Sequence, residues 1–575
     1  MIKNNYFSDN PDIMLHFESI INWAETVRAY EGDFEDYKKY QSGDERFALA
    51  VQNTEEAVNY YREILNSAGD IAGRTLSQAA SEIEKKGLRF ENGKVFFPSE
   101  MEDAVAKIRE AGLIPNGFGR QYGGLGIPFA VKAFFGEVFY RADVSTTVTA
   151  FCVNLAEILE KHASQKMKEE WLPQLSNGHY TVSMGLTEPN HGSDLPNILT
   201  KAEKKEDGTW ILNGTKRFIT QACGFTDMEG IILTLARTGG NGARGLSFFL
   251  VKSSDVQIAS LERKMGMHSS PTCEVVLENS PGLLIGEEGH GLSRYVIGML
   301  NGARINIAFE GTGIASAAYY EAEKYAKERI QFGKPIIEIP AVKKILGRMH
   351  REMLAMRCVS LEGARSVDMY HWREERLKSG MKIDIPEEEL KFWEKIASIL
   401  TPAAKYYCSE TCNKIAYDAV QVHGGAGYTE DYDVSRIYRD ARVASIYDGT
   451  SQIQVMAAIG GIMSGFSKNG HLKKYFSNLS EGFALSSEMK KILEMLEESV
   501  LLYKSLPSSE AKEESAEDIV ELFIRSVAGL LLEKSSVKAG QVQKTERLKT
   551  AELYNRDTYS SGLGKIFRLK EMQKS

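Results

Sequence analysis

The chain has 575 residues, of which 43% are hydrophobic and 26% charged, and its formal net charge is -8. This length exceeds one ordinary hydrophobic core, so we expect about two to four packed units. The small negative charge gives no indication of nucleic-acid binding. Six scattered cysteines form no CxxC pair, so we expect no disulfide framework and no metal site. Free thiols favour a cytoplasmic location, and no segment approaches the roughly 18 apolar residues of an integral membrane segment.

The first part of the chain is predicted to be helical, from about residue 10 to about residue 175. Apolar residues recur at helical spacing in "LHFESIINWAETV" and in "VQNTEEAVNYYREILNSA", and strand-like runs are few. A glycine-rich turn, "GRQYGGLGIP", interrupts this pattern. The sequence therefore predicts an N-terminal helical domain over residues 1–178.

The pattern changes near His179 to short β-rich segments separated by turn signals. The pairs Asp207-Gly208 and Asn213-Gly214 are typical of tight turns. The segment "GNGARG", residues 240–245, fits the GxGxxG dinucleotide pattern, but it lies between two strand-like runs, "IILTLA" and "LSFFLV". A nucleotide-binding glycine turn opens a helix, so we predict a hairpin loop here. Residues 179–289 are predicted to form a central antiparallel β domain.

Helical periodicity returns at Gly291 and continues to about Ser464, which predicts a C-terminal four-helix-type bundle over residues 290–465. Amphipathic stretches at 485–505 and 515–537 then flank the polar linker "SLPSSEAKEES". They predict an additional helical domain over residues 466–575. The fold class is therefore α+β.

Two segments of the predicted β domain carry groups that could contact a cofactor. In "MGLTEPNHGSD" the Thr187 and Ser193 hydroxyls could donate to a flavin edge or a phosphate, although composition alone favours a plain strand exit. In "NGTKRFIT" the side chains of Phe218 and Thr220 share one face of a strand and Ile219 the other. That face could pack against a planar cofactor, or it could form a cross-strand pair in the core.

Two segments of the predicted helical bundle also carry groups that could either contact a cofactor or have an ordinary structural role. Arg329, at a helix end in "ERIQFGKPI", could bind a phosphate or could be an exposed arginine at the negative end of a helix dipole. In "QVHGGAGYTED" one of the three glycines suits a helix C-cap, but capping does not explain all three. Glycines without this role allow the backbone to approach a ligand closely.

Taken in order, these motifs resemble those of the acyl-CoA dehydrogenase family. The resemblance extends from about Glu102 to Met463 and rests on the segments "GRQYGGLGIP", "GLTEP", "GSD", "LNGTKRFIT", "KMGMHSSPTCEVVLE", "IGEEGHGL", "RIQFGKPI", "QVHGGAGYTED" and "IYDGTSQIQ". It implies an FAD enzyme built as helices, β domain and helices. It also implies α-proton abstraction from an acyl thioester, with hydride transfer from the β carbon to flavin N5.

The resemblance also implies residue roles. The expected FAD contacts are Leu186 and Thr187 at the pyrimidine side, Ser193 at the pyrophosphate, Phe218, Ile219 and Thr220 at the isoalloxazine, Arg329, Gln331, Gln421, Gly424 and Gly425 at the adenine half of a neighbouring subunit's FAD, and Thr450 and Gln452 beside the catalytic acid. The expected acyl-CoA contacts are Ser193, Asn301, Arg304 and Gly449.

Asp448 is the candidate catalytic base. The family commonly has Glu in the motif "YEGT", and this chain has Asp, which is shorter by one methylene, about 1.5 Å. A second base position used by some branches matches Ala303, which cannot serve. The alternative is that Asp448 only helps to start a helix, because Asp448 and Thr450 before "SQIQ" favour a helix start and Ser451 and Gln454 have capping-box spacing.

The expected product is an enoyl-CoA, and the expected electron acceptor is an electron-transfer flavoprotein. The added C-terminal unit resembles that of larger family members and implies a homodimer. Two alternatives are an acyl-CoA oxidase, which reoxidises its flavin with oxygen, and a catalytically silent protein that binds flavin and acyl-CoA.

Overall fold

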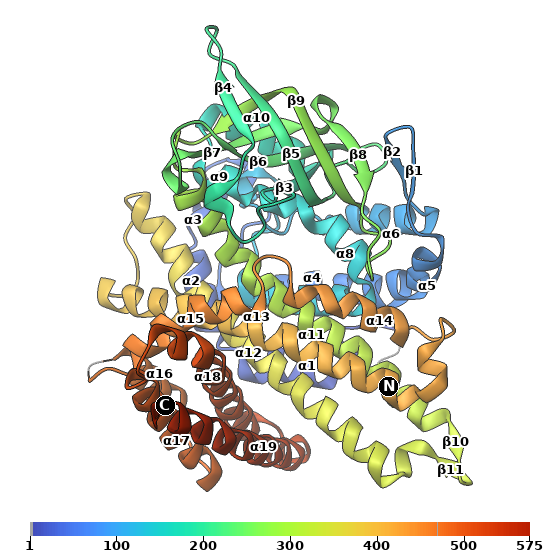
Figure 1. Ribbon diagram of the computed structural model, residues 1–575, viewed down its shortest axis with the longest axis vertical. Coiled ribbons are helices and arrows are strands. Elements are labelled where there is room, and N and C mark those ends of the chain that lie inside the picture. Colours follow the sequence, from blue (N-terminus) through green and yellow to red (C-terminus); the bar gives the residue numbers. More distant parts are fainter. Residues whose placement is uncertain (1–3, 469, 575) are drawn as a thin grey trace. The chain divides into compact units, whose positions relative to one another are not determined.

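The structure, a computed structural model, describes residues 4–468 and 470–574, without the side chains of residues 299–301 and 541–542. Contacts divide the chain into two compact units, which we describe separately (Figure 1). Unit 1 comprises Met1–Tyr6, Phe34–Ile127 and Ala142–Gly302, and unit 2 comprises Phe7–Asp33, Pro128–Arg141 and Ala303–Ser575.

Three of the helices of unit 1 begin at polar capping residues. Asn53, Asp143 and Ser164 each accept a hydrogen bond from a backbone N–H three residues later, which fixes the starts of α4, α8 and α10. The helices are α3 (Glu35–Gln41), α4 (Thr54–Ile71), α5 (Ser77–Lys86), α6 (Ser99–Glu110), α8 (Val144–Phe151), α9 (Glu157–His162) and α10 (Gln165–Ser176). A small hairpin, β1 (Arg89–Glu91) and β2 (Lys94–Phe96), lies within this predicted helical region.

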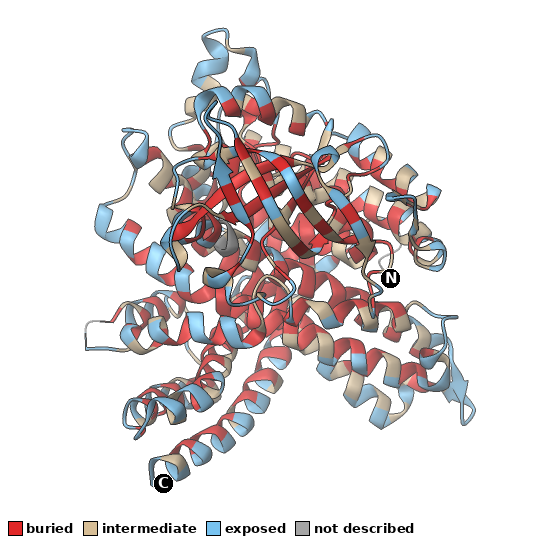
Figure 2. Ribbon diagram, turned by 45° about the horizontal axis from the view of Figure 1, so that its top comes forward, coloured by how far each residue is buried: buried red, intermediate tan, exposed pale blue. Residues whose placement is uncertain are grey.

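A seven-stranded sheet forms the rest of unit 1. Its strands are β3 (Tyr180–Gly185), β4 (Lys201–Lys204), β5 (Trp210–Thr220), β6 (Glu229–Arg237), β7 (Leu246–Lys252), β8 (Gln257–Leu261) and β9 (Thr272–Ile285). Most neighbours are antiparallel, as predicted, but β3 runs parallel to β6. Buried residues alternate with more exposed ones along β5 and β9 (Figure 2), and one of the resulting cores gathers around Trp210 and Phe249.

The turn predictions had mixed outcomes. Asp207-Gly208 does form the turn between β4 and β5, and residues 240–245 join the paired strands β6 and β7, so the hairpin prediction is confirmed. The prediction of a turn at Asn213-Gly214 is wrong, because both residues lie inside β5 at an irregularity in its pairing with β9. A Cβ on Gly214 would approach the Thr200 hydroxyl to 2.4 Å, so close packing explains this glycine.

Unit 2 is built mainly from helices, several of them long. They are α1 (Pro11–Leu15), α2 (Trp23–Glu31), α7 (Phe129–Ala142), α11 (Ile297–Glu328), α12 (Pro340–Lys378), α13 (Glu387–His423), α14 (Val434–Ala441), α15 (Ser451–Gly465), α16 (His471–Leu479), α17 (Ser487–Lys504), α18 (Ser509–Lys538) and α19 (Gln541–Lys574), with a hairpin of β10 (Ile330–Gln331) and β11 (Lys334–Pro335) after α11. α11 and α13 pack closely at Gly311, where a Cβ would lie 2.8 Å from the Cys408 carbonyl oxygen.

Buried charges tie N-terminal segments to the C-terminal helices of unit 2. The Arg357 guanidinium on α12 pairs with Glu137 on α7 and with Asp12 on α1. The Asp368 carboxylate, also on α12, accepts the backbone N–H groups of Phe129 and Ala130 at 2.8 Å each. These links join residues more than 200 positions apart, so local periodicity could not reveal them. The four domain boundaries proposed from the sequence stay a prediction.

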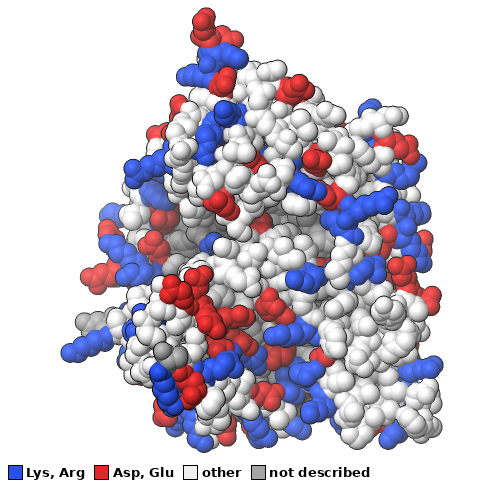
Figure 3. All heavy atoms as spheres, viewed as in Figure 1, with Lys and Arg blue, Asp and Glu red and all other residues white. Residues whose placement is uncertain are grey.

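The C-terminal extension consists of α16 to α19 and includes the two predicted amphipathic helices as α17 and α18. Its α18 attaches to the bundle through Arg525, whose Nη2 donates to Glu352 Oε1 on α12 at 2.8 Å. Within the extension Lys565 on α19 pairs with Asp518 on α18 at 3.0 Å. Figure 3 shows acidic and basic side chains next to one another on the surface of the protein. None of the described helices has the length and apolarity that a bilayer crossing requires.

Candidate active site

Asp448 lies in a tight turn of unit 2, between η12 (Arg442–Ser445) and α15. Its φ is 51° and that of Gly449 is 91°, so two successive residues adopt the left-handed region. Asp tolerates this conformation better than most residues, because its short polar side chain can bond locally. The carboxylate of Asp448 is therefore presented by an unusual backbone and not by a regular helix.

The helix-start interpretation of this segment is correct for Thr450 and wrong for the other residues. The N-cap of α15 is Thr450, whose hydroxyl accepts the Ile453 N–H. The predicted capping box of Ser451 and Gln454 is wrong, because the helix begins one residue earlier than that pattern requires. The Ser451 hydroxyl donates to Glu410 Oε1 at 2.5 Å, and the Gln454 amide donates to the carbonyls of Asp448 and Gly449 at 3.2 and 2.9 Å. Asp448 has no capping role in this arrangement.

The surroundings of Asp448 raise the pKa of its carboxyl above the ordinary value. Burial is the main cause, and the positive charges of Lys405 and Arg304 oppose it. Burial also lowers the pKa of Lys405 to about 8, against the attraction of Asp448 and Glu310. A carboxylate with a raised pKa is a stronger base, which suits the abstraction of a weakly acidic proton.

Of the predicted acyl-CoA contacts, Arg304 and Gly449 lie at this turn. Arg304, on α11, interacts electrostatically with Asp448, while burial lowers the pKa of its guanidinium. Gly449 follows Asp448 directly. The side chain of Asn301 lies outside the described residues, and Ser193 is an exposed residue of unit 1.

The loop after β3 is held by a buried ion pair. The Lys216 ammonium on β5 donates to the Leu186 carbonyl at 3.1 Å and to Glu188 Oε1 at 2.9 Å. The two Glu188 oxygens also accept the backbone N–H groups of Leu199 and Thr200, at 2.6 and 2.9 Å. The side chains of Lys216 and Glu188 are only 0% and 4% exposed. This network fixes the backbone of Leu186 and Thr187, the residues predicted to contact the flavin pyrimidine side.

Phe218 is not part of the core. Its ring is 54% exposed and its φ is 64°, at an irregularity in the pairing of β5 with β9. Thr220 is half-buried on the same face, and Ile219 is buried on the other. The alternative of a cross-strand core pair is therefore wrong, whereas the predicted alternation of faces stays a prediction at this irregular part of β5. An exposed aromatic ring with a hydroxyl beside it fits a flat aromatic ligand such as an isoalloxazine.

The residues predicted for the adenine half are exposed on unit 2. Gln331 lies in the β10–β11 hairpin and Arg329 directly before it, whereas Gln421 lies in the last turn of α13 and Gly424 and Gly425 directly after this helix. Gly424 caps α13 with a φ of 61°. Gly427 is required by packing, since a Cβ there would lie 2.7 Å from the Val420 carbonyl oxygen, whereas Gly425 faces open space. Gly425 is thus the glycine that local structure leaves unexplained. Thr450 and Gln452 lie at the start of α15, where Gln452 is exposed.

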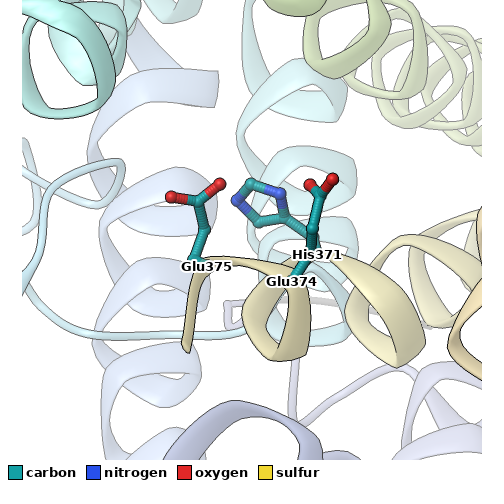
Figure 4. A group of neighbouring side chains, drawn as sticks. All are labelled: His371, Glu374 and Glu375. Carbon is teal, nitrogen blue, oxygen red and sulfur yellow. The ribbon is translucent and has the colours of Figure 1, made fainter. Parts of the chain in front are cut away.

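One group of described side chains has the spacing of metal ligands. His371, Glu374 and Glu375 lie on consecutive turns of α12, with potential ligand atoms within 4.8 Å of one another (Figure 4). The Lys378 ammonium pairs with Glu374 at 3.0 Å and with Glu375 at 3.2 Å, so a cation already compensates both carboxylates. We assign no metal to this group.

The sequence interpretation missed the side chains that hold the Leu186–Thr187 backbone in unit 1 and the Asp448 turn in unit 2. These are Lys216 and Glu188 in unit 1, and Lys405 and Glu310 in unit 2, each 0% to 4% exposed. One signal could have indicated Lys405 and Glu310: each is a single charge inside an otherwise apolar or small-residue stretch, "LTPAAKYYC" and "INIAFEGTGIA". A charge at such a position needs a buried partner.

Comparison with known proteins identifies the family. Residues 60–179, 183–280 and 289–462 match the N-terminal, middle and C-terminal domains of acyl-CoA dehydrogenases, in that order. The chain belongs to the acyl-CoA dehydrogenase family. It is an oxidoreductase of the class that acts on CH–CH groups, and FAD is the cofactor of this family. The predicted fold class is confirmed as well.

Several family members resemble this chain over most of their length. It is 33% identical to 3-methylmercaptopropionyl-CoA dehydrogenase of Ruegeria pomeroyi, over 70% of this chain and 72% of that protein. It is 31% identical to a subunit of the caffeyl-CoA reductase–Etf complex of Acetobacterium woodii, over 69% of this chain and 96% of that protein. A structure of an acyl-CoA dehydrogenase with FAD from Bacillus anthracis has the same fold, with a TM-score of 0.73, 22% identity and 88% of each chain covered.

Proposed function

We propose that this family member is an FAD-dependent acyl-CoA dehydrogenase in which Asp448 removes the α proton of the substrate. Bound FAD would accept the β hydrogen as hydride, and the product would be an enoyl-CoA. The observation that carries the proposal is the turn at Asp448, where an acid with a raised pKa lies beside Arg304, a predicted acyl-CoA contact.

The side chains of this chain divide the work of the reaction. Asp448 takes the α proton, and the Gly449 N–H polarises the thioester carbonyl as enolate-like charge develops. Arg304 orients the acyl-CoA. FAD, when bound, supplies the hydride acceptor. The exposed Phe218 side chain and the Thr220 hydroxyl are the groups that would hold the isoalloxazine, the first by packing and the second as a hydrogen-bond donor.

The polar ends of FAD require other groups. Leu186 and Thr187 bind the pyrimidine edge and Ser193 the pyrophosphate. The adenine half is bound by Arg329, Gln331, Gln421, Gly424 and Gly425 of a neighbouring subunit, with Thr450 and Gln452 completing the site. Exposure of the side chains of Ser193, Arg329, Gln331, Gln421 and Gln452, and the open space at Gly425, support this assignment.

The test is anaerobic mixing of the purified, FAD-loaded protein with a panel of acyl-CoAs that differ in chain length, branching and ring character. At least one is expected to bleach the flavin absorbance near 450 nm and to yield the enoyl-CoA. If no acyl-CoA bleaches the flavin, the dehydrogenase function is wrong and the silent-protein alternative is favoured. Peroxide formation in air with the same substrate would favour the oxidase.

The reverse direction belongs in the same experiment, because some relatives are named reductases, including the caffeyl-CoA relative. By microscopic reversibility the same placement would let a protonated Asp448 return a proton to the α carbon of an enoyl-CoA. Oxidation of the reduced flavin by enoyl-CoAs, compared with its reduction by acyl-CoAs, gives the preferred direction.

We further propose a homodimer that passes electrons to an electron-transfer flavoprotein. The caffeyl-CoA relative, a subunit of an Etf complex, supports this acceptor. Six free cysteines support a reducing, cytoplasmic location. A sedimentation mass near two subunits is expected, and a mass near four would contradict the dimer.

A further inference from the structure

The turn that carries Asp448 is held by side chains from three helices of unit 2. The Lys405 ammonium on α13 donates to the carbonyl of Tyr447 at 2.6 Å and to the carbonyl of Gly449. The Gln454 amide on α15 donates to the carbonyls of Asp448 and Gly449. The carbonyls of all three residues of the turn therefore accept hydrogen bonds from buried side chains.

The third helix, α11, reaches this turn through Glu310. Its carboxyl group, 0% exposed, accepts a hydrogen bond from the Tyr447 hydroxyl through Oε2. Its other oxygen, Oε1, has no hydrogen-bond partner among the described residues. Tyr447 precedes Asp448 directly, so this bond fixes the side chain of the residue next to the base.

Burial keeps Glu310 mostly protonated at neutral pH. It raises the pKa of the Glu310 carboxyl to about 8, with Asp448 and Asp440 adding to the rise and with Tyr447 and Lys405 opposing it. A neutral carboxyl adds no second negative charge beside Asp448. It is also close in shape and charge to the amide of glutamine, which makes Gln a faithful replacement for its accepting role.

The position of the catalytic carboxylate relative to the substrate is more critical for Asp448 than for the Glu that is common in the family. A carboxylate shorter by about 1.5 Å has less reach toward the substrate, and misplacement of a reacting group by about 1 Å can cost about 100-fold in rate. The backbone of Asp448 adopts a left-handed conformation, which surrounding contacts must maintain. A side chain that holds Tyr447 in place therefore also determines the position of Asp448, the next residue.

We propose that Glu310 is a positioning residue for Asp448, acting as the buried acceptor that locks Tyr447. The proposal rests on the proposed role of Asp448 as base. Glu310 itself takes no proton from the substrate. Removing its accepting oxygen leaves the Tyr447 hydroxyl unsatisfied and loosens the turn, while the acyl-CoA contacts at Arg304 remain.

The test compares the FAD-loaded variants Glu310→Leu, Glu310→Gln, Tyr447→Phe and the double variant Glu310→Leu/Tyr447→Phe with the wild type. Each is mixed anaerobically with the best acyl-CoA from the panel. We expect Glu310→Leu and Tyr447→Phe each to lower the rate of flavin reduction by about 10- to 100-fold, with little change in KM. The double variant should be no slower than the slower single variant, because both changes remove the same hydrogen bond.

Glu310→Gln is expected to stay within about threefold of the wild type, because the amide oxygen still accepts the Tyr447 hydroxyl. A matched control is Thr312→Val on the same helix, which removes the buried bond between the hydroxyls of Thr312 and Ser360. It should lower the thermal midpoint without slowing flavin reduction. FAD content and thermal midpoint, measured for every variant, identify any that fail to fold.

Three outcomes would overturn the proposal: normal flavin reduction in Glu310→Leu, multiplied effects in the double variant, or a loss in Glu310→Gln as large as that in Glu310→Leu. The last result would mean that the acid itself is needed. The variant Asp448→Asn, measured in parallel, distinguishes a failure of the base assignment for Asp448 from a failure of the positioning role of Glu310. If it reacts normally, the base assignment itself fails; if it is inactive while all Glu310 variants are normal, only the positioning role fails.

Discussion

Replacing Asp448 with Asn is expected to lower kcat by about 10²- to 10⁴-fold, the usual contribution of a general base. Asn has nearly the same size, so acyl-CoA binding and KM should change little, but the amide cannot take the α proton. Turnover with an electron-transfer flavoprotein or an artificial acceptor measures the effect. If the Asp448→Asn variant binds FAD and keeps more than about one fifth of the wild-type rate, Asp448 is not the catalytic base.

Asp448→Glu is the matched control, because it keeps the acid and changes only its reach. It should retain more activity than Asp448→Asn, and its rate relative to the wild type tells whether the substrate is placed for the shorter side chain. The pH profile adds a second check. The base works only when ionised, so the wild-type rate should fall as the pH drops through its pKa, which burial places above the ordinary Asp value of about 3.9.

Lys216→Met is expected to produce the largest loss of stability, about 3–5 kcal/mol in the free energy of unfolding of unit 1. Breaking a buried ion pair costs this much because the remaining charge stays buried and unpaired. Here Glu188 would keep its two backbone donors but lose the Lys216 ammonium. The Leu186 carbonyl would lose its donor too, so we also expect weaker FAD binding. Urea unfolding and titration of the apoprotein with FAD measure the two effects.

The double variant Lys216→Met/Glu188→Gln is the control for this interpretation. It removes the uncompensated negative charge, so it should recover a large part of the stability that Lys216→Met loses. The Leu186 carbonyl would still lack the Lys216 ammonium as a donor, so FAD affinity should recover less than stability does. A single variant Lys216→Met as stable as the wild type would contradict the role of this pair.

Residues near one another in sequence were the most predictable. The period-two pattern of β5 fits the burial of Ile219 between the exposed Phe218 and the half-buried Thr220, because side-chain direction in a strand depends on local geometry. The turn at Asp207-Gly208 followed from composition in the same way. Asn213-Gly214 has an equally strong turn signal but lies inside β5, because packing against Thr200 determines this glycine.

The parts of the site that depend on distant contacts could not be predicted. Lys405 reaches the Asp448 turn from 42 residues before Tyr447, and Glu310 reaches it from 137 residues before. Both lie inside long helices whose periodicity predicts burial but not the partner. The sequence offered Asp448, Thr450 and Ser451 as residues that start α15, and their similar capping signals did not single out Thr450, which is the N-cap.

Single-turnover reduction of the flavin by Asp448→Asn tests the central claim most directly, because it isolates removal of the α proton and hydride transfer from later electron transfer. The FAD-loaded variant is mixed anaerobically with the acyl-CoA that reduces the wild type fastest, and the absorbance near 450 nm is followed. We predict that the spectrum of the variant responds to substrate binding but that bleaching is at least about 100-fold slower than in the wild type. Bleaching at the wild-type rate would contradict the assignment of Asp448 as the base.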